Sequence, residues 1–81
     1  MNIILYRKPG CPWAREVMDY LKEHNLPFED RDIITNPVFA KEVEEKTGQS
    51  KSPTLDIDGT YLRDAGVEEV AEYLETLGVK A

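Results

Sequence analysis

The chain has 81 residues, 41% of them hydrophobic and 32% charged, and carries a formal net charge of −6 at pH 7. These values predict one globular domain over residues 1–81 and exclude a disordered chain. The acidic balance argues against a nucleic-acid partner, because phosphate contacts need an extended basic face. No apolar run has the length of a membrane span and no leader-like segment is recognised, so we expect a monomeric, cytoplasmic protein without membrane contact.

The charge is unevenly distributed along the chain. Residues 1–15 hold Arg7, Lys8 and Arg15 and no acid, whereas the remaining residues hold seven basic and sixteen acidic side chains. A basic segment on an acidic body suits a small anionic ligand. Taken singly, Arg7 and Arg15 are interpreted as ordinary solvated charges.

The first half of the chain predicts two strands and two helices. Residues 2–7 form a short β-branched and aromatic run, typical of a buried strand. Residues 12–24 predict a helix whose apolar stripe contains Trp13, Val17 and Leu21. Residues 28–34 predict a second strand, and its charged middle is typical of a sheet edge. A second helix is predicted from Pro37 to about Thr47, with Phe39, Ala40 and Val43 buried and Glu42, Glu44, Glu45 and Lys46 solvated.

The second half predicts a hairpin followed by a helix. Strands over residues 54–57 and 60–63 flank Asp58-Gly59, a strong signal for a two-residue turn. A final helix is defined by Val67, Val70, Ala71, Leu74 and Leu77, with Glu68, Glu69, Glu72 and Glu75 on a solvated face. The resulting order is βαβαββα, in which a helix joins the first two strands in parallel.

Cys11 is the only cysteine, which excludes an intramolecular disulfide and a cysteine-rich metal site. Pro12 suits the first helical position, so Cys11 is expected at or beside the N-cap. Unpaired amides and the helix dipole favour a thiolate there, and Lys8 and Arg15 add positive charge. Cys11 is therefore a candidate nucleophile. The alternative is a small, buried apolar residue.

The segment Lys8-x-x-Cys11-Pro12-Trp13-Ala14 resembles the active-site segment of glutaredoxins, and Ser52-Pro53 matches the position of their cis proline. The resemblance extends over nearly all 81 residues. It implies a thioredoxin-like α/β fold, with a four-stranded mixed sheet flanked by helices. It also implies a glutathione-dependent thiol–disulfide oxidoreductase, with glutathione as co-substrate and glutathionylated or disulfide substrates. No metal is expected.

The same resemblance implies a glutathione site. Lys8, helped by Lys41 or Lys51, would meet the glycyl carboxylate, and the backbone of Ser52 beside Pro53 would pair with the extended peptide. The γ-glutamyl end would reach the amides of Gly66 and Val67 at the last helix. The glycine pair usual there is missing, and Asp64 is expected either to cap this helix or to meet the substrate ammonium. Trp13 is either a shield beside the sulfur or a core anchor, and Tyr6 is expected near the sulfur with its hydroxyl outward.

Ala14 stands where a dithiol glutaredoxin has its second cysteine, either naturally or through engineering. One thiol still permits a monothiol cycle with an external thiol. Two other functions stay open. One is a carrier of a two-iron, two-sulfur cluster held by two subunits and two glutathiones, although Pro12 and Trp13 would crowd such a site. The other is a non-catalytic binding module.

Overall fold

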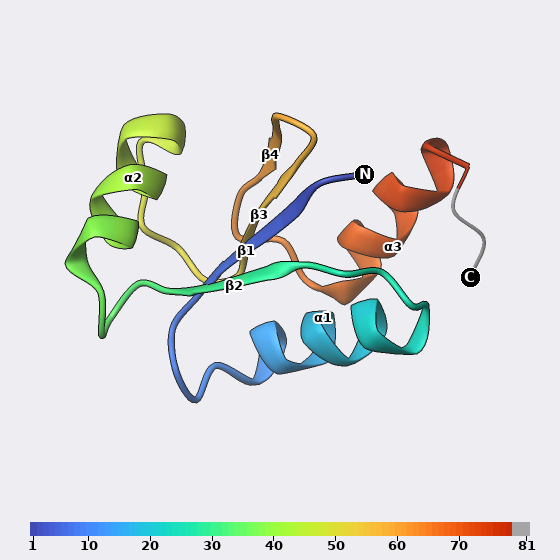
Figure 1. Ribbon diagram of the computed structural model, residues 1–81, viewed down its shortest axis with the longest axis horizontal. Coiled ribbons are helices and arrows are strands. Elements are labelled where there is room, and N and C mark those ends of the chain that lie inside the picture. The colour runs from blue at the N-terminus through green and yellow to red at the C-terminus, as the bar shows by residue number, and fades with distance from the viewer. Residues whose placement is uncertain (79–81) are drawn as a thin grey trace.

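The computed structural model describes residues 1–78. Its elements are β1 (Ile3–Arg7), α1 (Pro12–Glu23), β2 (Glu29–Asp32), α2 (Pro37–Thr47), β3 (Thr54–Ile57), β4 (Thr60–Leu62) and α3 (Val67–Thr76), arranged as Figure 1 shows. The predicted order βαβαββα is confirmed. None of these helices combines the length and the apolar character needed to cross a membrane.

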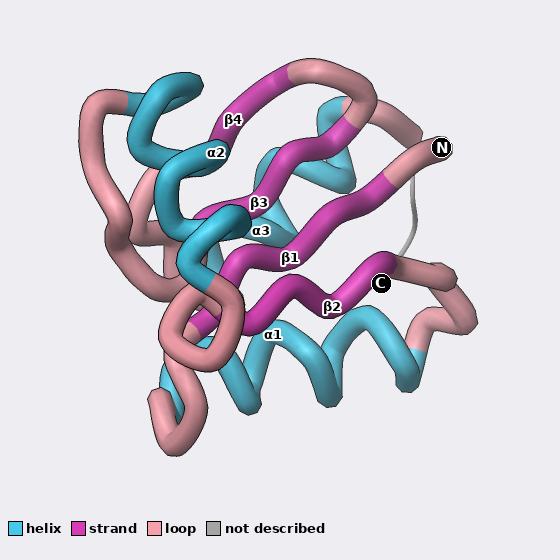
Figure 2. Tube along the Cα trace, turned by 60° about the vertical axis from the view of Figure 1, so that its left-hand side comes forward, coloured by secondary structure: helices cyan, strands magenta, loops and turns pink. Residues whose placement is uncertain are grey.

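The strands form one mixed sheet in the order β2-β1-β3-β4, and Figure 2 shows them side by side in this order. Strand β1 pairs in parallel with β2 and antiparallel with β3, which continues into the antiparallel hairpin with β4. The hairpin turn uses Asp58 and Gly59 at φ values of +51° and +91°, the positive values that a two-residue type I′ turn requires. Strand β2 lies at the sheet edge, as its charged sequence predicts.

Helices cover both faces of the sheet. On one face, Leu5 and Leu55 of the central strands pack with buried residues of α1 and α3, including Val17 and Leu74. Because successive side chains of a strand alternate between faces, Tyr6 lies on the other face, against α2. The sheet therefore separates a larger core under α1 and α3 from a smaller one under α2. This arrangement is the predicted thioredoxin-like fold.

The observed bounds of several elements differ from the predicted ones by one or two residues, and two of these differences have a local reason. Strand β2 ends earlier than the sequence predicts, because the Asp32 carboxylate accepts backbone hydrogen bonds from Ile34 at 2.8 Å and Thr35 at 3.0 Å. Such a side-chain turn competes with strand pairing. Helix α3 ends at Thr76, and Leu77 is 46% exposed instead of extending the apolar face.

Candidate active site

Residues 8–11 form a tight turn that carries the chain from β1 into α1. The backbone N–H of Cys11 donates to the carbonyl of Lys8 over 3.2 Å, and Gly10 adopts a φ of +79°. Proline at the second position and glycine with positive φ at the third are features of a type II turn. The turn places the thiol just beyond the carboxyl end of β1.

Cys11 is the N-cap residue of α1, and its side chain makes no capping hydrogen bond. Pro12 occupies the first helical position, where the missing N–H group costs nothing. The other amides of the first turn have no acceptor within the helix, and the helix dipole favours an anion at this end. The Cys11 side chain is half-buried, so the alternative of a fully buried apolar cysteine is wrong.

The segment Ser52-Pro53 faces the thiol from the loop before β3. The Cys11 Sγ lies 3.9 Å from the carbonyl oxygen of Ser52, and the Ser52 hydroxyl accepts a hydrogen bond from the Lys8 backbone N–H over 2.9 Å. The Ser52–Pro53 peptide bond is cis. The Pro53 carbonyl in turn accepts from the backbone N–H of Ala65 over 2.9 Å. These contacts bring three distant segments together around one sulfur atom.

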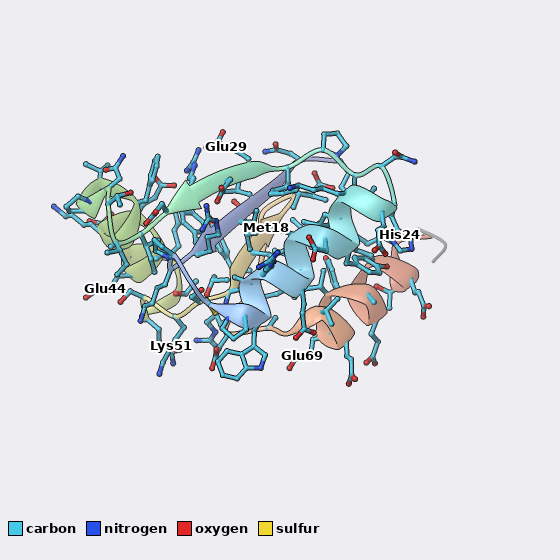
Figure 3. The ribbon with its side chains drawn as sticks, turned by 90° about the horizontal axis from the view of Figure 1, so that it is seen from below. Met18, His24, Glu29, Glu44, Lys51 and Glu69 are labelled. Atoms are coloured by element: carbon cyan, nitrogen blue, oxygen red, sulfur yellow. The ribbon has the colours of Figure 1, made fainter. Side chains whose placement is uncertain are left out.

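A groove of about 440 Å³ lies on the Ser52 side of the thiol. It is lined by Trp13, Ser52, Pro53, Asp64, Gly66 and Glu69. In Figure 3, Glu69 of α3 lies beside the start of α1, where it borders this groove. The groove therefore combines an exposed indole, a polar loop and the start of α3 with two carboxylates.

Four of the predicted glutathione-binding residues line this groove, namely Trp13, Ser52, Pro53 and Gly66. The other two do not line it. The Lys8 side chain is exposed, and the Val67 side chain packs against the larger core. Trp13 is 62% exposed, so the prediction of a core anchor is wrong.

Asp64 is not the N-cap of α3. That position belongs to Gly66, which offers no side-chain hydrogen bond to the helix. Asp64 instead adopts a left-handed φ of +51° two residues earlier and lines the groove. Within residues 1–78, the N-cap of α3 consequently provides no side-chain acceptor for the first-turn amides.

Tyr6 is buried on the α2 face of the sheet, so the expectation that it flanks the sulfur is wrong. Its hydroxyl donates to Glu42, which also accepts a hydrogen bond from Arg31. The Arg31 guanidinium lies over the rings of Tyr6 and Phe39, at 5.7 Å and 5.2 Å from their centroids. Glu42 is therefore part of a half-buried network, and the prediction that it is solvated is also wrong.

A second pocket, of about 480 Å³, opens on the other side of the thiol; we call it the basic pocket. It is lined by Arg7, Gly10, Cys11, Pro12, Arg15, Met18, Asp19 and Lys22. Arg7 is not a plainly solvated charge, because its guanidinium binds both carboxylate oxygens of Asp30 at 2.7 Å and 2.8 Å. That hydrogen bonding raises the pKa of Arg7 above its ordinary value.

Sequence reasoning missed Glu69 in the groove and Lys22 in the basic pocket. Glu69 belongs to a row of glutamates on α3, and its place in the first helical turn was the one available signal. Lys22 lies two helical turns beyond Arg15, on the same side of α1, which was the corresponding signal there. Among residues 1–78, no group of three or more His, Cys, Asp or Glu side chains is placed to hold a metal ion.

The family model described as Glutaredoxin matches residues 3–62. The chain belongs to the glutaredoxin family. A glutaredoxin-like protein of Clostridium pasteurianum, described as an uncharacterised 8.6 kDa protein in a rubredoxin operon, is 29% identical over 73 residues, which is 90% of this chain and 97% of that protein. The N-acetyl-S-hydroxy-L-cysteine reductase of Bacillus subtilis is 29% identical over 76 residues, 93% of this chain and 81% of the reductase.

This glutaredoxin-family chain is also similar to transcriptional regulators. The global transcriptional regulator Spx 1 of Oceanobacillus iheyensis is 33% identical over 58 residues, 72% of this chain and 44% of the regulator. The chain thus spans less than half of the regulator's length. Among solved structures, a variant of the thioredoxin-like protein BC3987 gives a TM-score of 0.81 at 25% identity, covering 89% of this chain and 97% of the other.

Proposed function

We propose that the chain catalyses glutathione-dependent thiol–disulfide exchange by a monothiol mechanism, with Cys11 as the nucleophile. The observation that carries this proposal is the half-buried thiol at the N-cap of α1, 3.9 Å from the carbonyl oxygen of Ser52. The thiol has access to solvent and lies at the N-terminal end of α1, where an attacking sulfur can reach a bound disulfide. Family membership supports redox chemistry at this position.

The cycle requires one protein sulfur, the glutathionyl group that the substrate carries, and one free glutathione. The Cys11 thiolate attacks the glutathionyl sulfur of a mixed disulfide, and the substrate leaves as a thiolate that takes a proton from water. A second glutathione thiolate then attacks the glutathionyl sulfur on Cys11, which releases glutathione disulfide and regenerates the Cys11 thiolate. Ala14 cannot supply a resolving thiol, so the second step depends on the external thiol.

The groove supports binding of an extended tripeptide. The backbone of Ser52 would pair with the peptide as an added piece of strand, and Trp13 would cover one side. The uncapped amides at Gly66 and Val67 would receive the γ-glutamyl carboxylate, while Asp64 and Glu69 would meet its ammonium group. Lys8, exposed beside the Ser52 hydroxyl, would reach the glycyl carboxylate from outside the groove.

Replacement of Cys11 by serine tests the proposal. A serine hydroxyl at this N-cap can accept a first-turn amide, so Cys11→Ser is expected to keep the thermal unfolding midpoint or raise it slightly. Release of glutathione from a glutathionylated peptide is expected to fall to the rate measured without protein. Equal activity of the native chain and Cys11→Ser would exclude Cys11 as the nucleophile.

The second candidate is a binding module without catalysis, which the likeness to the Spx regulator favours. The two functions predict different rates of thiol–disulfide exchange between Cys11 and glutathione disulfide. A binding module would react with glutathione disulfide no faster than free N-acetylcysteine does, whereas the proposed enzyme exceeds that rate and loses the excess on Cys11→Ser. The relative named as a reductase of a small cysteine derivative supports the enzymatic alternative.

A further inference from the structure

Cys11 lies between two pockets of opposite charge. Trp13 lines the groove and Arg15 lines the basic pocket. These two residues are about 200° apart around the helix axis, because each residue of an α-helix turns the chain by about 100°. The pockets therefore occupy opposite flanks of α1 at its N-terminus. The charged groups lining the groove are the carboxylates Asp64 and Glu69, whereas three cations and one carboxylate line the basic pocket.

The positive charge of the basic pocket comes mainly from Arg15 and Lys22. Arg7 already holds Asp30, so that pair adds little net charge. Both Arg15 and Lys22 are exposed, and neither forms an ion pair within residues 1–78. Asp19 is the carboxylate that partly offsets them. A net positive charge is left next to the thiol.

Apolar residues, among them Met18, also line part of the basic pocket. Met18 packs against the larger core and, together with Lys22, borders both the basic pocket and a neighbouring hollow lined by Leu26, Pro27 and Phe28. Figure 3 shows Met18 on the side of α1 toward the sheet. A volume of about 480 Å³ falls within the range of small-molecule sites. A ligand that fits combines a carboxylate, a sulfur and a short apolar part.

Building on the thiol exchange proposed above, we propose that the basic pocket binds the carboxylate of a small disulfide substrate. The half of the disulfide that enters the pocket has the size of an N-acylated cysteine. Arg15 and Lys22 hold the carboxylate while the substrate sulfur meets Cys11 from the flank opposite the groove. The Cys11 thiolate attacks this sulfur, the substrate disulfide breaks, and the leaving thiolate takes a proton from water. A thiolate from solution then attacks the substrate sulfur on Cys11, so that one disulfide is consumed and one is formed.

Three small disulfides of similar length test this proposal: dithiodipropionate with two carboxylates, neutral bis(hydroxyethyl) disulfide, and cystamine with two ammonium groups. The rate of Cys11 with each is divided by the rate of free N-acetylcysteine with the same disulfide. We expect this normalised rate to be roughly 3- to 10-fold higher for dithiodipropionate than for the neutral disulfide, which is the range that two exposed ion pairs can provide. The preference is expected to shrink with added salt and to disappear in Arg15→Gln/Lys22→Gln.

Lys46→Gln is the matched control for Lys22→Gln, because each lysine lies in the last turn of its helix. Lys46→Gln is expected to retain the full preference. A preference that survives in the double variant, or that falls equally in Lys46→Gln, would overturn the basic pocket as the carboxylate site. Glutathione disulfide is tested in parallel. If Cys11 fails to react with glutathione disulfide but still prefers dithiodipropionate, the proposed glutathione dependence is wrong. The proposed carboxylate site in the basic pocket is then retained.

Discussion

Tyr6 is five residues before Cys11 in the sequence, and its side chain nevertheless lies on the far face of the sheet. The alternation of a strand explains this, because Ile3 and Leu5 take the face under α1 and α3 and leave Tyr6 to the face under α2. The closeness of Tyr6 to Cys11 in the sequence therefore did not predict whether its side chain lies in the site. Cys11 at a helix start was predictable, because Pro12 marks that start locally.

In the Tyr6→Phe variant, the free energy of unfolding is expected to depend less on pH in the alkaline range than it does in the native protein. Burial raises the pKa of Tyr6, and the hydrogen bond to Glu42 and its charge raise it further. The folded state thus keeps its proton above the unfolded pKa of about 10. The contribution of this hydroxyl to the free energy of unfolding is complete below that pH and falls as the pH rises above it. Urea unfolding at several pH values between about 8 and 11 measures the slope, and parallel curves for both proteins would contradict the assignment.

The turn over residues 8–11 shows which features of an element can be predicted from sequence. Pro9-Gly10 is a local signal for this turn, Asp58-Gly59 is one for the hairpin turn, and Asn36-Pro37 is one for the start of α2. The end of β2 was mispredicted because Asp32 bonds its own backbone, a choice that strand propensity does not contain. The start of α3 at Val67 was predicted correctly, but the capping role that was one alternative for Asp64 belongs to Gly66.

Gly10→Ser and Gly66→Ser separate backbone strain from steric fit. A Cβ atom at either position meets no other atom within 4 Å, but Gly10 has a φ of +79° whereas Gly66 has an ordinary −77°. Gly10→Ser is therefore expected to lower the free energy of unfolding by about 1 kcal/mol and to slow exchange at Cys11. Gly66→Ser supplies an N-cap hydroxyl and is expected to be neutral or slightly stabilising. Denaturant titration compares them, and equal losses would show that the turn conformation is not responsible.

On the scale of the whole molecule, the sequence predicts the fold better than the site. Hydrophobic periodicity predicts most of the elements, although β2 consists of charged residues. The order of the strands in the sheet follows from the resemblance to glutaredoxins. The groove depends on Trp13, the Ser52 loop and the start of α3, which meet only through tertiary packing. The opposite charges of the two pockets arise in the same way, because Glu69 and Lys22 belong to helix faces that look uniformly solvated in sequence.

Leu55→Ala tests whether the larger core holds the molecule together. Leu55 is fully buried in β3, between β1 and β4. Truncation of this side chain is expected to lower the free energy of unfolding by roughly 2–5 kcal/mol. This loss is a large part of the stability of a small domain. Leu77→Ala, at a 46% exposed position, is the control and is expected to change stability by less than about 0.5 kcal/mol. Similar unfolding midpoints for the two variants would contradict the burial pattern.

Trp13 is the only tryptophan of the chain, and its indole is largely exposed on the wall of the groove. Tryptophan fluorescence of the native protein therefore originates at the candidate site and reports directly on what enters it. A compound that covers the indole shifts the emission toward shorter wavelengths, whereas one that occupies only the opposite flank of α1 leaves the indole in water. The unlabelled protein is thus its own optical probe for distinguishing the two pockets.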